Sequence, residues 1–248
     1  MSKKIKKKKN KNRLIILVLA VIAALFATAM FIRDEVITML SAYSEDSSAP
    51  NIEETEIKYT EEKESYDLEY DLQISCIDNY AGVYMEDGTD DIVSGIMMLE
   101  LVNNSQQDLQ LARIYLTYPE FVAEFEVTNL PSGTSAVLLE KNRREWEGGS
   151  PDKIEVQNVV FFEEKMSTEA DKVEVSGGDG AIDITNISGE SISGDIYVYY
   201  KNIIDEKFYG GITYRAKVSG LNDGETVRMT TEHFSSDQSK IVMVTINE

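Results

Sequence analysis

The chain has 248 residues, a length that allows one or two domains, and its hydrophobic fraction of 42% is ordinary for a globular protein. The net charge of -20 is unevenly distributed, because eight of the 24 basic residues lie within residues 1–13 and the rest of the chain holds 44 acidic residues. Such an acidic body repels phosphate, so we do not expect it to bind nucleic acid. The single cysteine, Cys76, excludes an intramolecular disulfide and a multi-cysteine metal site, and its alternating apolar context indicates a buried thiol.

The N-terminus combines a basic arm, residues 1–13, with a long apolar run. The basic residues of the arm are Lys3, Lys4, Lys6, Lys7, Lys8, Lys9, Lys11 and Arg13. Residues 14–32, LIILVLAVIAALFATAMFI, carry neither charge nor proline, and as a helix they would span about 28 Å, close to the thickness of a bilayer core. We therefore predict a transmembrane helix over residues 14–32, extending at most to about residue 43. Because basic residues beside a span stay in the cytoplasm, we expect the N-terminus inside and the body outside.

An alternative for the same segment is a secretory signal that is cleaved near Ala29. Ala27-Thr28-Ala29 fits the small-x-small pattern of a cleavage site. Both interpretations export the body and differ only in whether it stays tethered. The apolar run continues past Ala29 through Ile32, which favours the anchor.

The segment that follows is predicted to be a linker, and the rest of the chain to be strands. Residues 44–65 are acidic, contain several serines and have few aromatics, a composition typical of an extended linker. From about residue 66 apolar and polar residues alternate, as in Leu99-Glu100-Leu101, and turn signals such as Asn222-Asp223-Gly224 recur at short spacing. No sustained helical period follows residue 50. Many short strands with regular turns predict an all-β sandwich or barrel.

The strand region contains an internal repeat. Residues 99–118, LELVNNSQQDLQLARIYLTY, match residues 182–200, IDITNISGESISGDIYVYY, and Leu-Pro-Ser-Gly at 130–133 matches Leu-Asn-Asp-Gly at 221–224. Because the order of the matches is kept, we predict two domains of one type, copy 1 over residues 66–164 and copy 2 over residues 165–248. Copy 2 has extra residues from about Lys201 to Gly211, which we expect to form a surface hairpin.

Each copy has a strand that ends in Asn-x-Ser, a central strand of alternating apolar and aromatic residues, a hairpin, and a Leu-x-x-Gly turn. This order resembles the FxLYD-type modules, immunoglobulin-like β-sandwiches of exported bacterial proteins. The stretches YYKN, GGITYR and HFSSDQSKIV, which begin at Tyr199, Gly210 and His233, are similar to segments of single-pass membrane proteins of low-GC Gram-positive bacteria. The resemblance implies two tandem immunoglobulin-like sandwiches after the membrane helix and linker, and it implies no activity.

The sequence offers no catalytic constellation and no cofactor motif. His233 is the only histidine, which excludes a two-histidine metal site, and no Gly-x-Ser-x-Gly elbow or phosphate-binding loop is present. The loop from Glu86 to Asp91 is acidic, so that Asp87, Asp90 and Asp91 are weak candidates for calcium ligands. The loop lacks the alternating spacing of a calcium loop, and we expect an acidic surface turn instead. The two Asn-x-Ser sites fit a glycosylation sequon, but their equivalent places favour a role in turns.

The best candidate for a binding surface comes from comparing the two copies. Where the outward face of copy 1 has Thr117, copy 2 has Tyr199. The aromatic residues gathered there are Tyr197, Tyr199, Phe208, Tyr209 and Tyr214. A partly exposed tyrosine surface suits recognition of a peptide or glycan, and the alternative is that these rings pack on the other domain or under the hairpin.

These features favour a single-pass membrane protein with a role in interaction or envelope scaffolding, without catalysis. Its expected partners are the membrane and a protein of the envelope or membrane. Two alternatives stay open: a sensory or regulatory subunit that couples an external signal to a membrane partner, and an exported enzyme.

Overall fold

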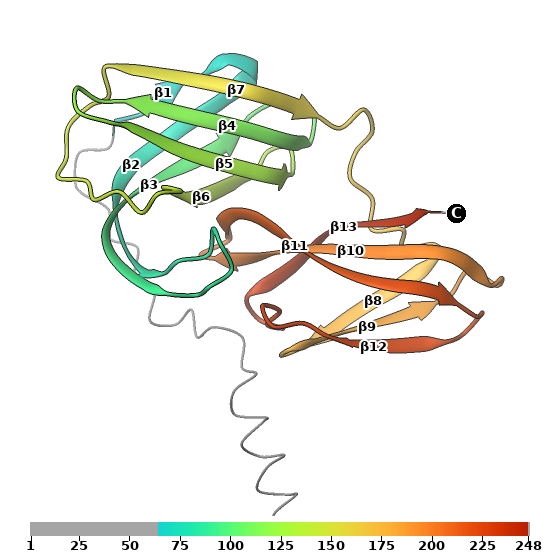
Figure 1. The fold of residues 1–248 in the computed structure, drawn as a ribbon. Coiled ribbons are helices and arrows are strands. Elements are labelled where there is room, and N and C mark those ends of the chain that lie inside the picture. Colours follow the sequence, from blue (N-terminus) through green and yellow to red (C-terminus); the bar gives the residue numbers. More distant parts are fainter. Residues whose placement is uncertain (1–63, 248) are drawn as a thin grey trace, which may run out of the picture. The chain divides into compact units, whose positions relative to one another are not determined.

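The computed structural model describes residues 64–247 (Figure 1). The predicted basic arm, the predicted transmembrane helix and all but the last two residues of the predicted linker lie outside the described residues. Residues 64–247 fall within one compact unit. Between residues 64 and 247 no helix has the length and apolar character needed to cross a membrane.

Thirteen strands and one short helical turn make up this part of the chain. They are β1 (Tyr66–Asp67), η2 (Glu69–Asp71), β2 (Leu72–Val83), β3 (Ile92–Asn103), β4 (Leu109–Thr117), β5 (Val122–Leu130), β6 (Ser135–Leu139), β7 (Lys153–Phe161), β8 (Val173–Gly178), β9 (Ala181–Asn186), β10 (Ile192–Ile204), β11 (Lys207–Leu221), β12 (Thr226–Thr230) and β13 (Ser239–Asn247). The all-β prediction is therefore confirmed.

The strands form three sheets, and the order of the strands repeats between the two copies. One sheet has the order β1-β2-β3-β6-β11-β10-β13, and two smaller sheets have the orders β5-β4-β7 and β12-β9-β8 (Figure 1). In copy 1 the layer β2-β3-β6 packs against the layer β5-β4-β7. In copy 2 the layer β8-β9-β12 packs against the layer β11-β10-β13. Each copy thus uses its strands in the same order, as the repeat in the sequence predicts.

Each copy closes a core between its two layers. Leu99, Phe125 and Leu138 belong to one buried cluster in copy 1, and Ile184 and Val198 belong to another in copy 2. The alternation in the strands explains this packing, because every second side chain points to the same face of a sheet. The layers therefore pack face to face as in a β-sandwich.

The Asn-x-Ser sites have the same hydrogen bonds in both copies. The side chains of Asn103 and Asn186 are fully buried, and each amide nitrogen donates to two main-chain carbonyls while the amide oxygen accepts from the serine two residues later. The carbonyls belong to Gln107 and Leu130 in copy 1 and to Glu190 and Leu221 in copy 2. Both amides are thus engaged inside the turns that they close.

The two copies share the seven-stranded sheet. The start of β11 pairs in parallel with β6, with Phe208 opposite Ala136 and Tyr209 opposite Val137. An ion pair of 2.7 Å between Lys207 Nζ and the buried Glu100 joins β11 to β3, the strand on the other side of β6. The extra residues of copy 2, for which a surface hairpin was predicted, therefore expose only their tip at Asp205 and Glu206. The predicted division at residues 164 and 165 stays a prediction, and the shared sheet crosses it.

Candidate functional site

The junction between the copies is built around a glycine. Gly211, on β11, lies so close to β5 that an added Cβ would be 1.7 Å from the carbonyl oxygen of Glu126. Only hydrogen fits at this distance, which explains why the sequence has Gly210-Gly211 just after the buried aromatic pair. Gly210 itself has a φ of +80°, where a side chain would be strained.

A buried lysine connects β5 and β11 through hydrogen bonds next to this glycine. Lys201, which occupies a bulge of β10, is fully buried, and its Nζ donates to the carbonyls of Thr128 at 3.1 Å, Gly211 at 3.0 Å and Ile212 at 2.7 Å. Burial lowers the pKa of the Lys201 ammonium. Because the acceptors lie on strands of both copies, this side chain ties β5 to β11.

Glu86 completes the junction from the loop between β2 and β3. Its carboxylate accepts hydrogen bonds from the main-chain N–H groups of Leu139 at 2.9 Å and Gly211 at 2.9 Å. Burial raises the pKa of the Glu86 carboxyl, although these N–H donors and the charge of Lys201 act in the opposite direction. The carboxylate therefore bridges β6 and β11 beyond the point where their pairing ends.

The other acids of this loop contact basic side chains of the protein and do not converge on one point. Asp87 and Asp91 both pair with Arg143, at 2.7 and 2.9 Å. Asp90 lies 3.1 Å from Nδ1 of His233 in copy 2, and burial raises the pKa of the Asp90 carboxyl. Within residues 64–247 no cluster of three or more histidine, cysteine or acidic side chains could hold a metal ion. The weak calcium candidates Asp87, Asp90 and Asp91 thus attach the loop to Arg143 and His233.

The five aromatic residues that were predicted to bind a ligand separate into two groups. Phe208 and Tyr209 are 3% and 1% exposed, so that their predicted place on a binding surface is wrong. They point to opposite faces of the shared sheet, and each face is covered there by a buried cluster. Tyr214 is half-buried and stacks on Tyr200 and on His233. The rings of all three therefore contribute to packing, which was the alternative interpretation.

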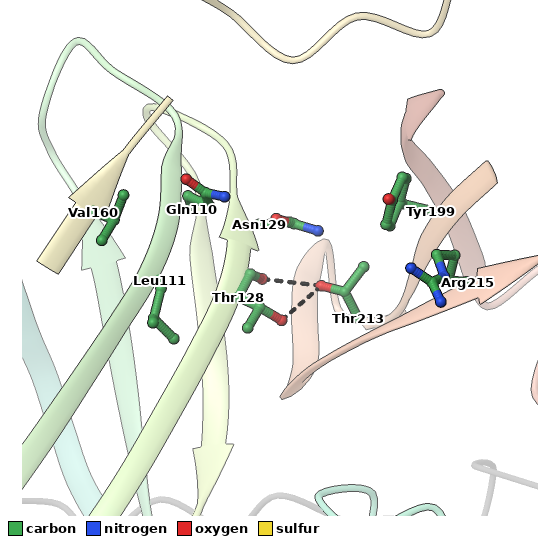
Figure 2. A pocket seen from close by; sticks show the side chains of 8 residues that line it. All are labelled: Gln110, Leu111, Thr128, Asn129, Val160, Tyr199, Thr213 and Arg215. Carbon is green, nitrogen blue, oxygen red and sulfur yellow. Dashed lines mark hydrogen bonds between the residues drawn. The ribbon is translucent and has the colours of Figure 1, made fainter. Parts of the chain in front are cut away.

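Tyr199 lies in an open groove of about 700 Å³ between the two copies (Figure 2). Its wall in copy 2 consists of Tyr199, Thr213 and Arg215, and its wall in copy 1 consists of Gln110, Leu111, Thr128, Asn129 and Val160. The hydroxyls of Thr128 and Thr213 are hydrogen-bonded at 2.9 Å and join the two walls. The Thr213 hydroxyl also lies 3.4 Å from Lys201 Nζ, so the groove is directly next to the junction.

The groove presents an unusual set of polar groups for this acidic protein. None of the lining residues is acidic, and Arg215 is the only charged one. The guanidinium of Arg215 is 4.9 Å from the centre of the Tyr197 ring. Tyr197, which was also predicted to bind a ligand, therefore supports Arg215 and does not itself line the groove. Asn129, near the end of β5, is only 8% exposed as a whole residue. Its side-chain amide points into the groove from β5 (Figure 2).

A second hollow of about 280 Å³ lies beside Trp146 and the Gly148-Gly149 turn. Glu64 lines it, and the Glu64 carboxylate accepts hydrogen bonds from the hydroxyl of Ser150 at 2.8 and 2.7 Å. The first described residue of the chain thus already occupies its edge, and the larger groove is the better candidate for a ligand.

Sequence reasoning found one wall of the groove and missed the other. The difference between Thr117 and Tyr199 pointed to the outward face of β10, where Tyr199 lies opposite Arg215 of β11. Asn129 and Val160 gave no signal, because they become neighbours of Tyr199 only through the contact between the copies.

No protein-family model, curated protein or solved structure matches this chain. The lone histidine, His233, lies between Asp90 and the ring of Tyr214. What the molecule does must therefore be argued from the groove and from the arrangement that holds it.

Proposed function

We propose that this protein is a non-catalytic interaction protein of a bacterial envelope, anchored by residues 14–32, with the groove as its recognition surface. In this proposal copy 1 and copy 2 are tandem immunoglobulin-like domains that share one sheet. The basic arm keeps the N-terminus in the cytoplasm, and residues 66–248 lie outside. The anchor and the orientation rest on the uncharged run and on the eight basic residues before it.

The observation that carries the proposal is the groove itself. It lies where two copies of one fold meet, and the junction of Gly211, Lys201 and Glu86 fixes the distance between its walls. A surface with a fixed spacing loses little conformational freedom on binding, which favours recognition. The lining combines apolar side chains with the guanidinium of Arg215 and the side-chain amide of Asn129, the mixture expected of a binding site.

Site-specific photocrosslinking in the native membrane tests the groove. A photoreactive residue at Val160, which is 43% exposed and lines the groove, should crosslink to a discrete partner. The matched control is Ile187, an aliphatic residue that is 47% exposed and does not line the groove. Identical crosslinks from both positions, or none from Val160, would count against recognition at this site.

Protease digestion of cells stripped of their wall tests the orientation. We expect the strand region to be degraded in intact cells while a cytoplasmic marker survives. Replacing the basic residues of the arm with glutamine should weaken this orientation, because those residues retain the N-terminus inside. A body that resists protease until the membrane is broken would place it in the cytoplasm and refute this part of the proposal.

A further inference from the structure

We infer that the groove binds an extended peptide segment that carries a carboxylate. This inference rests on the proposed function and specifies its ligand.

Arg215 supplies the selectivity for an anion. Arg113, Arg143 and Arg228 each form an ion pair with a carboxylate of the protein, whereas no described acid lies within ion-pair distance of Arg215. Its guanidinium lies instead over the Tyr197 ring, and this leaves the N–H groups at the edge of the plane free. A guanidinium edge binds a carboxylate through two parallel hydrogen bonds.

The charge around the groove supports the same choice. Lys217, the next basic residue on that face of β11, is already paired with Asp195 at 2.7 Å. The lining contains no acid, although the chain holds 44 acidic residues. Acids are thus absent where a carboxylate of the ligand would bind, and Arg215 is the cation left to meet it.

Asn129 supplies a site for the main chain of the ligand. A side-chain amide offers one acceptor and two donors, which match the N–H and C=O groups of a peptide unit. Asn129 is 8% exposed as a whole residue, and its amide is directed into the open groove. Such an amide can exchange the water of the groove for the N–H and C=O groups of a ligand.

The apolar lining favours a peptide over a glycan. Leu111 and Val160 are opposite each other on β4 and β7 and present aliphatic surface that suits an aliphatic side chain. A sugar ring stacks best on an open aromatic face, but Tyr199 is half-buried and its ring is tilted against Tyr197, with centroids 6.5 Å apart. The groove therefore has contacts for a side chain, a peptide unit and a carboxylate, and lacks a flat platform.

The test is an NMR titration of the full-length chain in detergent micelles with three probes. The first is the acetylated, amidated pentapeptide Ala-Val-Leu-Ala-Asp, and the second is the same peptide with Asn in place of Asp. The third is the tetramer of N-acetylglucosamine, a neutral glycan. We expect the Asp peptide to shift the side-chain resonances of Asn129 and Arg215 and to bind about tenfold more tightly than the Asn peptide, the ratio expected for one charge-assisted contact.

Two arginine variants test whether Arg215 causes the preference for the Asp peptide over the Asn peptide. Arg215→Gln should reduce the difference between the two peptides to about twofold or less. Arg228→Gln is the matched control, because Arg228 is an exposed arginine on β12 of the same copy, outside the groove, and it should retain the tenfold difference. Equal binding of the two peptides to the unmodified protein, or a tenfold difference that survives Arg215→Gln, would overturn the inference.

The outcomes also separate this inference from the proposed function. If the glycan shifts the Asn129 resonance and neither peptide does, the ligand is a glycan, the inference fails and the groove is still a recognition site. If no probe shifts a groove resonance, the inference fails as well. Crosslinking from Val160 then decides independently whether the groove recognises anything.

Discussion

Replacing Gly211 with alanine should open the junction between the copies. The added Cβ would lie 1.7 Å from the carbonyl oxygen of Glu126 and 2.9 Å from its carbonyl carbon. A carbon and an oxygen that are not bonded normally stay at least about 3.3 Å apart, so β5 and β11 would have to separate locally by about 1.6 Å. Both partners are main-chain atoms of strands, and neither can rotate away as a flexible side chain would.

The hydrogen bonds across the junction determine how much the free energy of unfolding should fall. A separation of this size would break the bond from Lys201 Nζ to the carbonyl of Thr128, now 3.1 Å, and the bond between the hydroxyls of Thr128 and Thr213, now 2.9 Å. Overpacking costs about 1–3 kcal/mol. The lost bond of a charged donor adds about 1.5–3 kcal/mol and the neutral bond about 1 kcal/mol. We expect a total loss of about 3.5–7 kcal/mol, a large part of the usual stability of about 5–15 kcal/mol.

Urea unfolding of the chain without residues 1–48 measures this loss, since residues 64–247 belong to one compact unit. Trp146 is the only tryptophan and packs against the core of copy 1, so its fluorescence reports copy 1, whereas far-ultraviolet circular dichroism reports both copies. The two signals should coincide in the unmodified protein. In Gly211→Ala they should separate, because each copy keeps its own core after the junction has opened.

Gly178→Ala is the matched control for this experiment. Gly178 also lies in a strand, β8, and an added Cβ there would meet only the end of the Arg228 side chain, at 3.9 Å. We expect an effect of less than about 1 kcal/mol at this position. If Gly211→Ala remained within about 1 kcal/mol of Gly178→Ala, with coincident signals, the reasoning about the close approach of β5 and β11 would be refuted.

Three further changes test other parts of the structure. Lys201→Met should lower the free energy of unfolding in urea by about 3–5 kcal/mol, because three main-chain carbonyls and the Glu86 carboxylate lose their buried cation. A loss below about 1 kcal/mol would contradict the role of Lys201 in the junction. Asn103→Ala and Asn186→Ala should each cost about 2–4 kcal/mol and agree within about 1 kcal/mol, since the two networks are equivalent, whereas a clear difference in urea midpoint would show that they are not. Burial raises the pKa of Tyr200 to about 12, so the stabilising effect of its neutral hydroxyl is complete below about pH 10 and is lost as the pH rises through about 12. Over that range the unmodified protein should lose on the order of 2 kcal/mol more than Tyr200→Phe, and parallel pH curves of unfolding would contradict this.

The sequence was sufficient for the strand layout and for the repeat. The alternation in Leu99-Glu100-Leu101 predicted a strand, because a strand with one face in the core shows period two, and β3 buries both leucines. The Asn-x-Ser sites were read as turns from their equivalent places, and their hydrogen bonds have that role. These features depend on local geometry and on comparison of one copy with the other, both of which a single sequence contains.

The junction was not predicted, although the sequence holds a sign of it. Residues 95–101, GIMMLEL, form a nearly continuous apolar run, which is typical of a strand that is covered on both faces. Met97 and Leu99 enter the core of copy 1, while Ile96 and Met98 enter a separate cluster on the opposite face of the sheet, together with Tyr209 of copy 2. Interpreting each copy as an independent sandwich assumed that this second face meets water, and that assumption placed Phe208 and Tyr209 on the surface.

The extra segment of copy 2 therefore has a different meaning from the one that its aromatic residues suggested. It supplies Lys201, the buried pair Phe208 and Tyr209, and Gly211, which are the groups that fuse the two sheets. Copy 1 lacks such a segment, so a chain of two simple repeats would have no parallel pairing between β6 and β11 and no fixed groove. If the groove is the recognition site, the residues that make recognition possible are mostly not those that touch the ligand. Gly211→Ala should then weaken binding of the Asp peptide as strongly as Arg215→Gln does, whereas Gly178→Ala should leave the binding unchanged.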